Sequence, residues 1–322
     1  MLATIWTSVQ GVLTIVIMIA IGYTLQGRGW FDDRFSGSLS KLIMRIALPC
    51  SIFMSMLTNF TLGKLTSLWV ELVIAVAGML VSYGIAIVAV RLLRVPRGRR
   101  GLMITAICGG NTVFIGMPLN VALFGNSSVP YLLVYYIVNT VLIWTLGVFI
   151  IAKDDPTVAH GAKASFDWRH LIPVPLYGFI VAIPFLLFGW QHVLPTFVTT
   201  TLSDVGGLVT PLSLIYIGIM LRSFGLRSMA LNTDALWTLV GRFVFSPLVM
   251  FGVVAVATGV FGASLPHLQM ETLIVQSATP CLAVLPILAN EYHGDVKYAT
   301  SAVTLTTVFF VIVVPVIMLL VH

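Results

Sequence analysis

Charged residues are scarce in this chain. Lys, Arg, Asp and Glu make up 9% of its 322 residues, whereas 59% are hydrophobic. Soluble domains carry about 25% charged residues, so this composition excludes an ordinary soluble domain. Apolar runs of about 20 residues, the length of a membrane-spanning helix, cover nearly the whole chain. The alternating pattern of a membrane β-barrel is missing. The sequence therefore predicts an all-α polytopic membrane protein.

The patterns that carry catalytic or metal chemistry are missing as well. The cysteines, Cys50, Cys108 and Cys281, lie inside apolar runs, at spacings that suit neither disulfides nor zinc sites. Zinc-protease motifs, nucleophile elbows and phosphate-binding loops are absent, and the acidic pair Asp32-Asp33 has no further acids nearby. We therefore expect no catalytic residue, no metal and no cofactor. The net charge of +6 is interpreted as orienting the chain in a membrane, not as binding nucleic acid.

Ten apolar segments joined by short connections are predicted to span the membrane. They are residues 5–25, 39–58, 68–92, 102–124, 129–152, 171–189, 200–221, 236–259, 270–290 and 297–321. The longest polar connection, residues 153–170, divides the chain into two sets of five, residues 1–155 and 156–322. An odd number of spans in each half makes the second half inverted relative to the first, a plan that many transporters share.

The basic residues gather on one side of this arrangement. The odd-numbered connections and the helix ends beside them contain Arg28, Arg34, Lys41, Arg91, Arg94, Arg97, Arg99, Arg100, Lys153, Lys163, Arg169, Arg222, Arg227 and Lys297. The even-numbered connections contain only Lys64. Because cytoplasmic loops carry the excess of Lys and Arg, we expect the odd connections in the cytoplasm. The chain is then a multi-pass protein of the cytoplasmic membrane with both termini outside.

Two of the ten segments contain residues that interrupt a membrane helix. Residues 109–119 read Gly-Gly-Asn-Thr-Val-Phe-Ile-Gly-Met-Pro-Leu, and residues 276–281 read Gln-Ser-Ala-Thr-Pro-Cys. The spacing from Asn111 to Pro118 recurs from Thr279 to Pro286. Unwound backbone survives in a membrane only where protein buries it or where it lines a cavity. Paired interruptions in the two halves of a chain therefore indicate a transporter's binding site.

The predicted topology gives this site a positive character. The second half of each interrupted helix begins near the midplane, so two helix N-termini, each carrying roughly half a positive charge, converge on one point. Pro280 suits the first position of such a half-helix because it lacks an N–H group. The Asn111 amide is expected to contact a carboxylate or to cap the half-helix. The expected substrate-binding residues are Asn111, Thr112, Gly110, Ser277, Thr279, Pro280, Arg242 and Asn139, and the expected structural or gating prolines are Pro49, Pro118, Pro211 and Pro286.

A few charged residues lie within the predicted spans or at their ends. Arg45 and Arg242 are the basic residues inside spans; either can extend to the lipid headgroups, and Arg242 is the better candidate for a substrate or gating contact. Glu71, Asp204 and Glu271 lie near outer helix ends, where any one of them could carry a coupling proton. We expect Glu71 and Glu271 to be solvated and Asp204 to lie deeper, which makes Asp204 the candidate for proton coupling. The sequence leaves open whether transport is coupled to H⁺ or to Na⁺.

The motifs, taken in order, resemble the auxin efflux carrier family over essentially the whole chain. They are Ile21-Gly22-Tyr23, Gly29-Trp30-Phe31, Ala47-Leu48-Pro49, Asn111-Thr112 with Gly116-Met117-Pro118-Leu119, Pro211-Leu212-Ser213-Leu214, Ser246-Pro247-Leu248 and Thr279-Pro280. The resemblance implies ten helices in two inverted repeats, with helices four and nine crossing at mid-membrane, a fold similar to bile-acid and sodium–proton transporters. It implies small organic anions as substrates, such as auxin in plants and malate or malonate in bacterial relatives.

We therefore expect a secondary transporter that moves a small organic anion by alternating access. A dicarboxylate such as malate or malonate is favoured, because the helix N-termini can hold one carboxylate and Arg242 a second. An aromatic weak acid like auxin becomes the better candidate if Arg242 extends to the headgroups. A transporter-like sensor without net flux is a further alternative, and an intramembrane enzyme is disfavoured. The expected partners are the substrate and the lipid bilayer, and a homodimer is left open.

Overall fold

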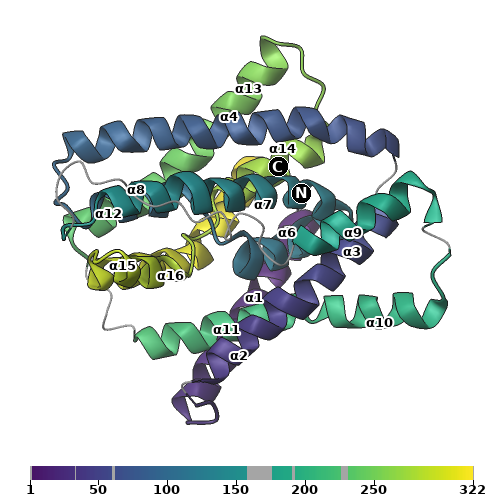
Figure 1. Ribbon diagram of the computed structural model, residues 1–322, viewed down its shortest axis with the longest axis horizontal. Coiled ribbons are helices and arrows are strands. Elements are labelled where there is room, and N and C mark those ends of the chain that lie inside the picture. The colour runs from purple at the N-terminus through teal and green to yellow at the C-terminus, as the bar shows by residue number, and fades with distance from the viewer. Residues whose placement is uncertain are drawn as a thin grey trace. The chain divides into compact units, whose positions relative to one another are not determined.

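The computed structural model describes residues 2–32, 34–59, 62–157, 176–190, 193–225 and 231–321 (Figure 1). Helices occupy each of the ten predicted segments, and the described residues form no β-strand. Five helical stretches among them are long and apolar enough to cross a membrane: Phe35–Thr58, Leu68–Leu92, Asn126–Lys153, Thr196–Ser223 and Thr233–Gly259. The all-helical class of a polytopic membrane protein is thereby confirmed. The inverted repeat, and membrane crossing by all ten segments, stay predictions.

The chain folds into two compact units. The first comprises Met1–Glu71, Val113–Val134 and Ile172–Ser223; the second comprises Leu72–Thr112, Tyr135–Leu171 and Phe224–His322. Each unit therefore takes helices from both halves of the sequence. The predicted repeats, residues 1–155 and 156–322, describe an internal symmetry of the chain, which this division into units does not test.

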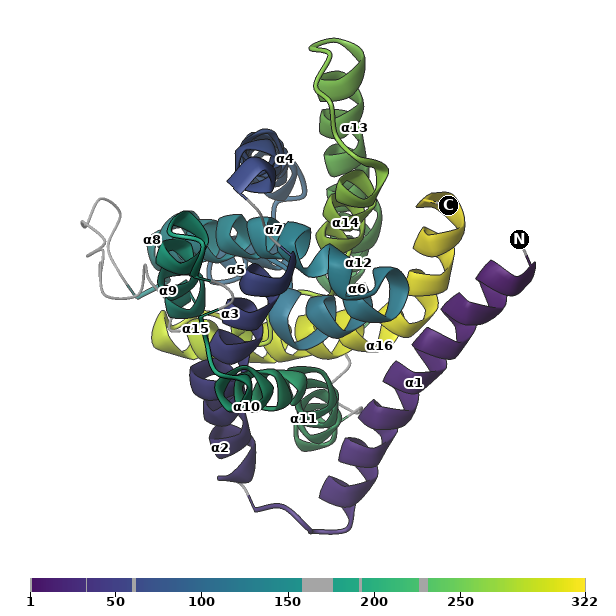
Figure 2. The same ribbon diagram turned by 90° about the vertical axis from the view of Figure 1, so that its right-hand side faces the viewer.

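The first unit is built from helices that approach one another through small residues. Its helices are α1 (Leu2–Gly27), α2 (Phe35–Leu42), α3 (Leu48–Asn59), α6 (Met117–Phe124), α9 (Leu176–Leu187), α10 (Thr196–Gly207) and α11 (Val209–Phe224). Helix α1 runs without a break (Figure 2). A Cβ atom on Gly22 of α1 would collide with the main chain of Ile215 on α11, and one on Gly218 with that of Ile19. Glycine thus permits the close helix contacts that membrane proteins favour.

The second unit contains the first part of one predicted interrupted helix, up to Thr112, and the whole of the other. Its helices are the part of α4 (Leu62–Leu92) beyond Glu71, α5 (Arg100–Cys108), the later part of α7 (Val129–Leu142), α8 (Val148–Lys153), α12 (Thr233–Val240), α13 (Ser246–Gly259), α14 (His267–Ser277), α15 (Leu285–Glu291) and α16 (Val296–Val321). In this unit α5 packs on α8, α13 on α14, and α16 on α12 and α15.

Short π-helical turns interrupt several helices of the chain. They lie at Ile43–Ala47, Thr112–Gly116, Ile143–Gly147 and Gly241–Phe245. The two arginines predicted within spans, Arg45 and Arg242, both lie in such turns. π turns are rare and frequently occur at functional sites, so residues in these turns are candidates for a functional role.

Residues from four predicted cytoplasmic connections meet at one end of the second unit. Arg99 of the third connection pairs with Asp234 at 2.9 Å and with Asp295 at 2.7 Å. His293 of the ninth connection lies 3.1 Å from Asp155 of the fifth. The third, fifth, seventh and ninth connections therefore share one side, as the sorting of basic residues predicts. Which side faces the cytoplasm stays a prediction.

Two carboxylates of this cluster, those of Asp155 and Asp295, have lowered pKa values. Hydrogen bonds from Thr157 and His293 lower the pKa of Asp155 to about 2. Partial burial opposes ionisation of Asp295, but the Tyr298 backbone N–H and the Arg99 guanidinium lower its pKa nonetheless. A network of this kind holds helix ends together more effectively than isolated surface ion pairs, which contribute little.

The orientation can be tested by cysteine accessibility in a variant without the native cysteines. Thr157 lies in the fifth connection, whose residues 158–170, Lys163 and Arg169 included, lie outside the described residues. Asn126 lies in the fourth connection and is exposed. A thiol reagent that cannot cross membranes should label Asn126→Cys in intact cells and Thr157→Cys only after the membrane is opened. Labelling of Thr157→Cys in intact cells would contradict cytoplasmic odd connections.

Candidate functional site

Both predicted interruptions are present in the structure. Helix α5 ends at Cys108, and the chain becomes helical again in the π turn Thr112–Gly116. Helix α14 ends at Ser277, and α15 begins at Leu285. In each case a short stretch of backbone loses its hydrogen bonds within the helix. In a membrane these groups need partners elsewhere in the protein.

The two interruptions supply partners for each other. Gly110 and Cys281 form an isolated antiparallel β-bridge. Beside it, the Asn111 backbone N–H donates to the Pro280 carbonyl at 2.8 Å. The unwound segments of the second unit are thus joined through their main chains.

Asn139 of α7 holds the first interruption in place. Its side-chain Oδ1 accepts from the Gly110 N–H at 3.0 Å, and its Nδ2 donates to the Gly110 carbonyl at 2.9 Å. Nδ2 also lies 3.4 Å from Thr112 Oγ1. A single buried amide therefore satisfies both polar groups of the Gly110 backbone, so the partner that this asparagine needs is the main chain.

Arg242 is fully buried in the second unit, with an exposed fraction of 0%. Its Nη1 donates to the Ile107 carbonyl at 2.8 Å, its Nε donates to the Thr279 carbonyl, and its Nη2 donates to Thr279 Oγ1 at 3.3 Å. The alternative in which Arg242 extends to the headgroups is therefore wrong. The side chain instead bridges the two interruptions.

The position of the guanidinium has an electrostatic reason. Ile107 is at the C-terminal end of α5, and Thr279 follows the C-terminal end of α14. Helix C-termini carry partial negative charge, which a cation stabilises. All three guanidinium nitrogens are engaged, so a bidentate carboxylate contact would require these bonds to rearrange. No carboxylate among the described residues forms an ion pair with Arg242.

Gly110 lies close to two side chains of the site. A Cβ atom built at this position would collide with Arg242 Nη2 and with Thr279 Oγ1. The glycine thus lets the backbone of the first interruption approach the arginine and the second interruption closely. This is a close-approach role, since Gly110 is not among the positive-φ glycines.

The other predicted substrate-binding residues are buried, and most have hydrogen bonds to local backbone. Ser277 donates to the Ile274 carbonyl at 2.6 Å, and Thr279 donates to the Gln276 carbonyl at 2.9 Å. The Asn111 side chain is 6% exposed. The structure therefore brings Gly110, Asn111, Thr112, Asn139, Arg242, Thr279 and Pro280 together around one point of the second unit. Their contact with substrate stays a prediction.

The four predicted structural prolines lie near helix starts, whereas Pro280 does not. Pro118 and Pro286 lie in the first turn of α6 and of α15, so their matching spacing reflects matching helix starts. The expectation that Pro280 occupies such a position is wrong, because Pro280 lies in the unwound stretch before α15. The other two predicted structural prolines lie near the starts of their helices, Pro49 in α3 and Pro211 in α11.

The charged residues at helix ends differ from the expectation. Asp204 is exposed on α10, and both its depth in the membrane and its role in proton coupling stay predictions. Glu71 is fully buried, and Glu271 is 6% exposed and lies 3.0 Å from His267 Nδ1, so neither is a solvated acid. Arg45 is exposed, as an arginine extending outwards would be. Position along a helix gives depth, but the face on which a residue lies decides its burial.

Two residues of the site were missed by sequence reasoning. Thr306 of α16 accepts from the Cys281 N–H at 3.3 Å and so supports the second interruption. The Tyr135 phenol of α7 interacts with the Arg242 guanidinium. The signal for Tyr135 was its position one helical turn before Asn139 on the same face. For Thr306 it was the row of threonines, Thr300, Thr304, Thr306 and Thr307, in an otherwise apolar helix.

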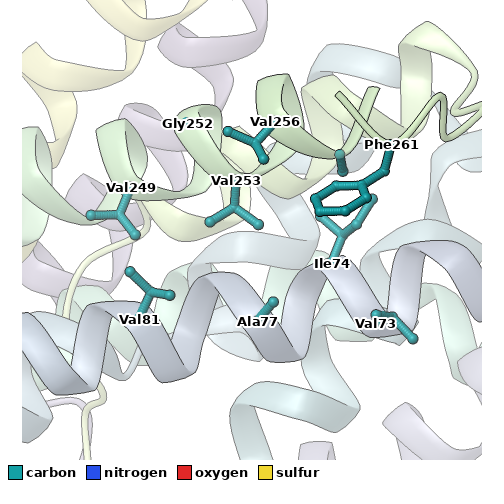
Figure 3. A pocket seen from close by; sticks show the side chains of 10 residues that line it. Val73, Ile74, Ala77, Val81, Val249, Gly252, Val253, Val256 and Phe261 are labelled. Atoms are coloured by element: carbon teal, nitrogen blue, oxygen red, sulfur yellow. The ribbon is translucent and has the colours of Figure 1, made fainter. Parts of the chain in front are cut away.

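A groove of about 550 Å³ lies elsewhere in the second unit, between α4 and α13 (Figure 3). Its lining is entirely aliphatic and aromatic, including Val81, Val253 and Phe261. None of the residues predicted to bind substrate lines it. The described residues also contain no group of three or more His, Cys, Asp or Glu side chains placed to hold a metal ion.

The role of Asn139 can be tested with a pair of asparagine variants. Asn139→Ala leaves the buried N–H and C=O of Gly110 without their partner, at a cost of about 1–3 kcal/mol for each unsatisfied group. We expect a clearly lower Tm in detergent for Asn139→Ala. The exposed Asn126→Ala should retain the wild-type Tm. Equal stability of the two variants would show that Gly110 does not depend on Asn139.

Comparison with known proteins agrees with this architecture. The sequence profile of a family described as "Membrane transport protein" matches residues 7–318. An uncharacterized transporter of Methanothermobacter thermautotrophicus is 23% identical over 309 residues, covering 96% of both chains. Another, from Methanocaldococcus jannaschii, is 21% identical over 313 residues, covering 94% of this chain and 95% of its own. These matches confirm the resemblance to the auxin efflux carriers. The chain therefore belongs to this family of membrane transport proteins.

Proposed function

We propose that this protein is a secondary transporter that moves a small organic anion across the cytoplasmic membrane. The observation that carries the proposal is Arg242, a fully buried cation that bridges two interrupted helices. Buried charges in membrane proteins usually mark a substrate or ion pathway. The family and the two archaeal relatives are described as transporters, which favours transport over catalysis.

The charge of the site supports an anion as the substrate. Arg242 has no carboxylate partner among the described residues and is stabilised by carbonyl oxygens. Carbonyl dipoles offset a full positive charge less completely than a carboxylate does, so the potential near the interruptions stays positive. We propose a dicarboxylate, such as malate or malonate, as the first candidate, because two negative charges gain more from that potential.

We propose that alternating access is carried out by the two inverted repeats of the chain. The first unit takes predicted spans one and two from the first half of the chain, and six and seven from the second. Spans one and six, and spans two and seven, correspond under the proposed symmetry and fall in the same unit, whereas Val113–Val134 of spans four and five fall in the first unit, apart from their counterparts in spans nine and ten. A transporter of this kind works when one helix set moves against the other around the substrate.

An aromatic weak acid such as auxin is the second candidate. The observation that favours it is the engagement of all three Arg242 nitrogens by Ile107 and Thr279. If these bonds persist during transport, the arginine contributes only a long-range electrostatic attraction. A substrate with a single negative charge is then enough for binding. A sensor without net flux is the third possibility, and it would bind the anion without moving it.

The interruptions can be tested by Asn111→Ala and Pro280→Ala. Loss of the Asn111 amide leaves buried groups unpaired, at about 1–3 kcal/mol. Without Pro280, α14 is free to extend and withdraws the carbonyl that accepts from the Asn111 N–H. Both variants should insert and fold but lose most flux in proteoliposomes. Asn126→Ala and Pro184→Ala, the latter within α9, are the matched controls and should transport normally. Normal flux in Asn111→Ala and Pro280→Ala would make the interruptions purely structural.

The substrate can be tested by competition against labelled malate uptake in proteoliposomes. If the dicarboxylate proposal holds, malonate and succinate compete strongly, because each carries two carboxylates, and indole-3-acetate competes weakly. The reverse order would favour the aromatic weak acid. A thermal shift with malate in detergent, without any uptake, would favour the sensor, since binding to the folded state raises stability by mass action.

A further inference from the structure

Glu71 is an acid buried inside an apolar span. It lies near the start of the stretch Leu68–Leu92 on α4 and is 0% exposed. Its neighbours Trp69 and Val73, which lie on other faces of the helix, are 67% and 52% exposed. The carboxyl group therefore lies on the side of α4 that other helices cover.

The Glu71 carboxyl has no hydrogen-bond partner among the described residues. Both oxygens are buried and make no hydrogen bond, and no ion pair with a described basic side chain is formed. Tyr131 of α7 is the titratable group with which it interacts electrostatically. An ionised carboxylate is strongly disfavoured in such surroundings, whereas a neutral carboxylic acid is tolerated.

The other acids near predicted helix ends have different surroundings. Asp204 is exposed, and Glu271 is paired with His267. Asp155 and Asp295 belong to the ionic cluster of the connections. Among the described residues, Glu71 is thus the acid whose surroundings within a membrane span require a proton.

We propose that Glu71 carries the coupling proton of the transport cycle, a role that rests on the transport function proposed above. In the conformation described, the carboxyl group is protonated and uncharged. When the helices around it move during alternating access and water reaches it, the group releases H⁺ and becomes a carboxylate. Each cycle of uptake and release moves one proton, and no other reactant is needed.

Glu71→Gln is the decisive variant, because the amide mimics the neutral acid but cannot titrate. Labelled malate flux is measured in proteoliposomes under pH gradients of both polarities, and malate–malate exchange is measured without a gradient. Wild-type net flux should change with the polarity of the gradient. Glu71→Gln should lose this response yet keep exchange, which needs no net proton movement. Asp204→Asn tests the acid that the sequence favoured for coupling, and because Asp204 is exposed we expect this variant to behave like the wild type in both assays; loss of the gradient response in Asp204→Asn alone would overturn the proposal.

Further outcomes keep the proposal falsifiable. A wild-type gradient response in Glu71→Gln would overturn it. If Glu71→Gln loses exchange as well, Glu71→Asp decides: recovery of the gradient response supports a titrating role, and its absence overturns it. An infrared carbonyl band of a protonated carboxyl, present in the wild type at neutral pH and missing in Glu71→Gln, tests the protonation without transport. If wild-type protein moves neither malate nor indole-3-acetate, the transport proposal fails, while this band still decides the state of Glu71.

Discussion

The requirement that every backbone polar group in a membrane finds a partner governs the second unit. A continuous helix meets it by itself, but an interrupted one must borrow partners from elsewhere. Here the two interruptions pair with each other at Gly110 and Cys281, and side chains that include Asn139, Arg242 and Thr306 bond further backbone groups. The cost of unwinding is therefore met by a connected polar network, whose members depend on one another.

Two buried ionisable side chains illustrate opposite solutions to the problem of burying charge. Arg242 stays charged, because carbonyls at the ends of α5 and α14 accept its hydrogen bonds. Glu71 has no hydrogen-bond partner among the described residues, so the neutral form is favoured. A guanidinium cannot lose its proton under physiological conditions, whereas a carboxyl group exchanges one readily. One residue is thus suited to hold an anion site in place, and the other to load and unload a proton.

The sequence predicted the class of fold and the location of the helix interruptions well. Helix interruptions at residues 109–119 and 276–281 follow from glycine, asparagine and proline in apolar runs, and both are found. The sidedness of the connections follows from the basic residues, and Arg99 and His293 indeed meet their partners at one end of the second unit. Individual roles were harder to predict. Pro280 was assigned to a helix start and Glu71 to a solvated position, and neither lies there.

The sequence by itself determined that the chain is an all-helical membrane protein, where its helices lie and where two of them break. Those properties depend on local hydrophobicity and backbone chemistry, which adjacent residues specify. Only the tertiary structure decided that Asn139 holds Gly110, that Arg242 bonds to carbonyls, and that Glu71 is buried. These outcomes depend on which helix faces meet. Such contacts join residues far apart in the chain, and no local pattern specifies them.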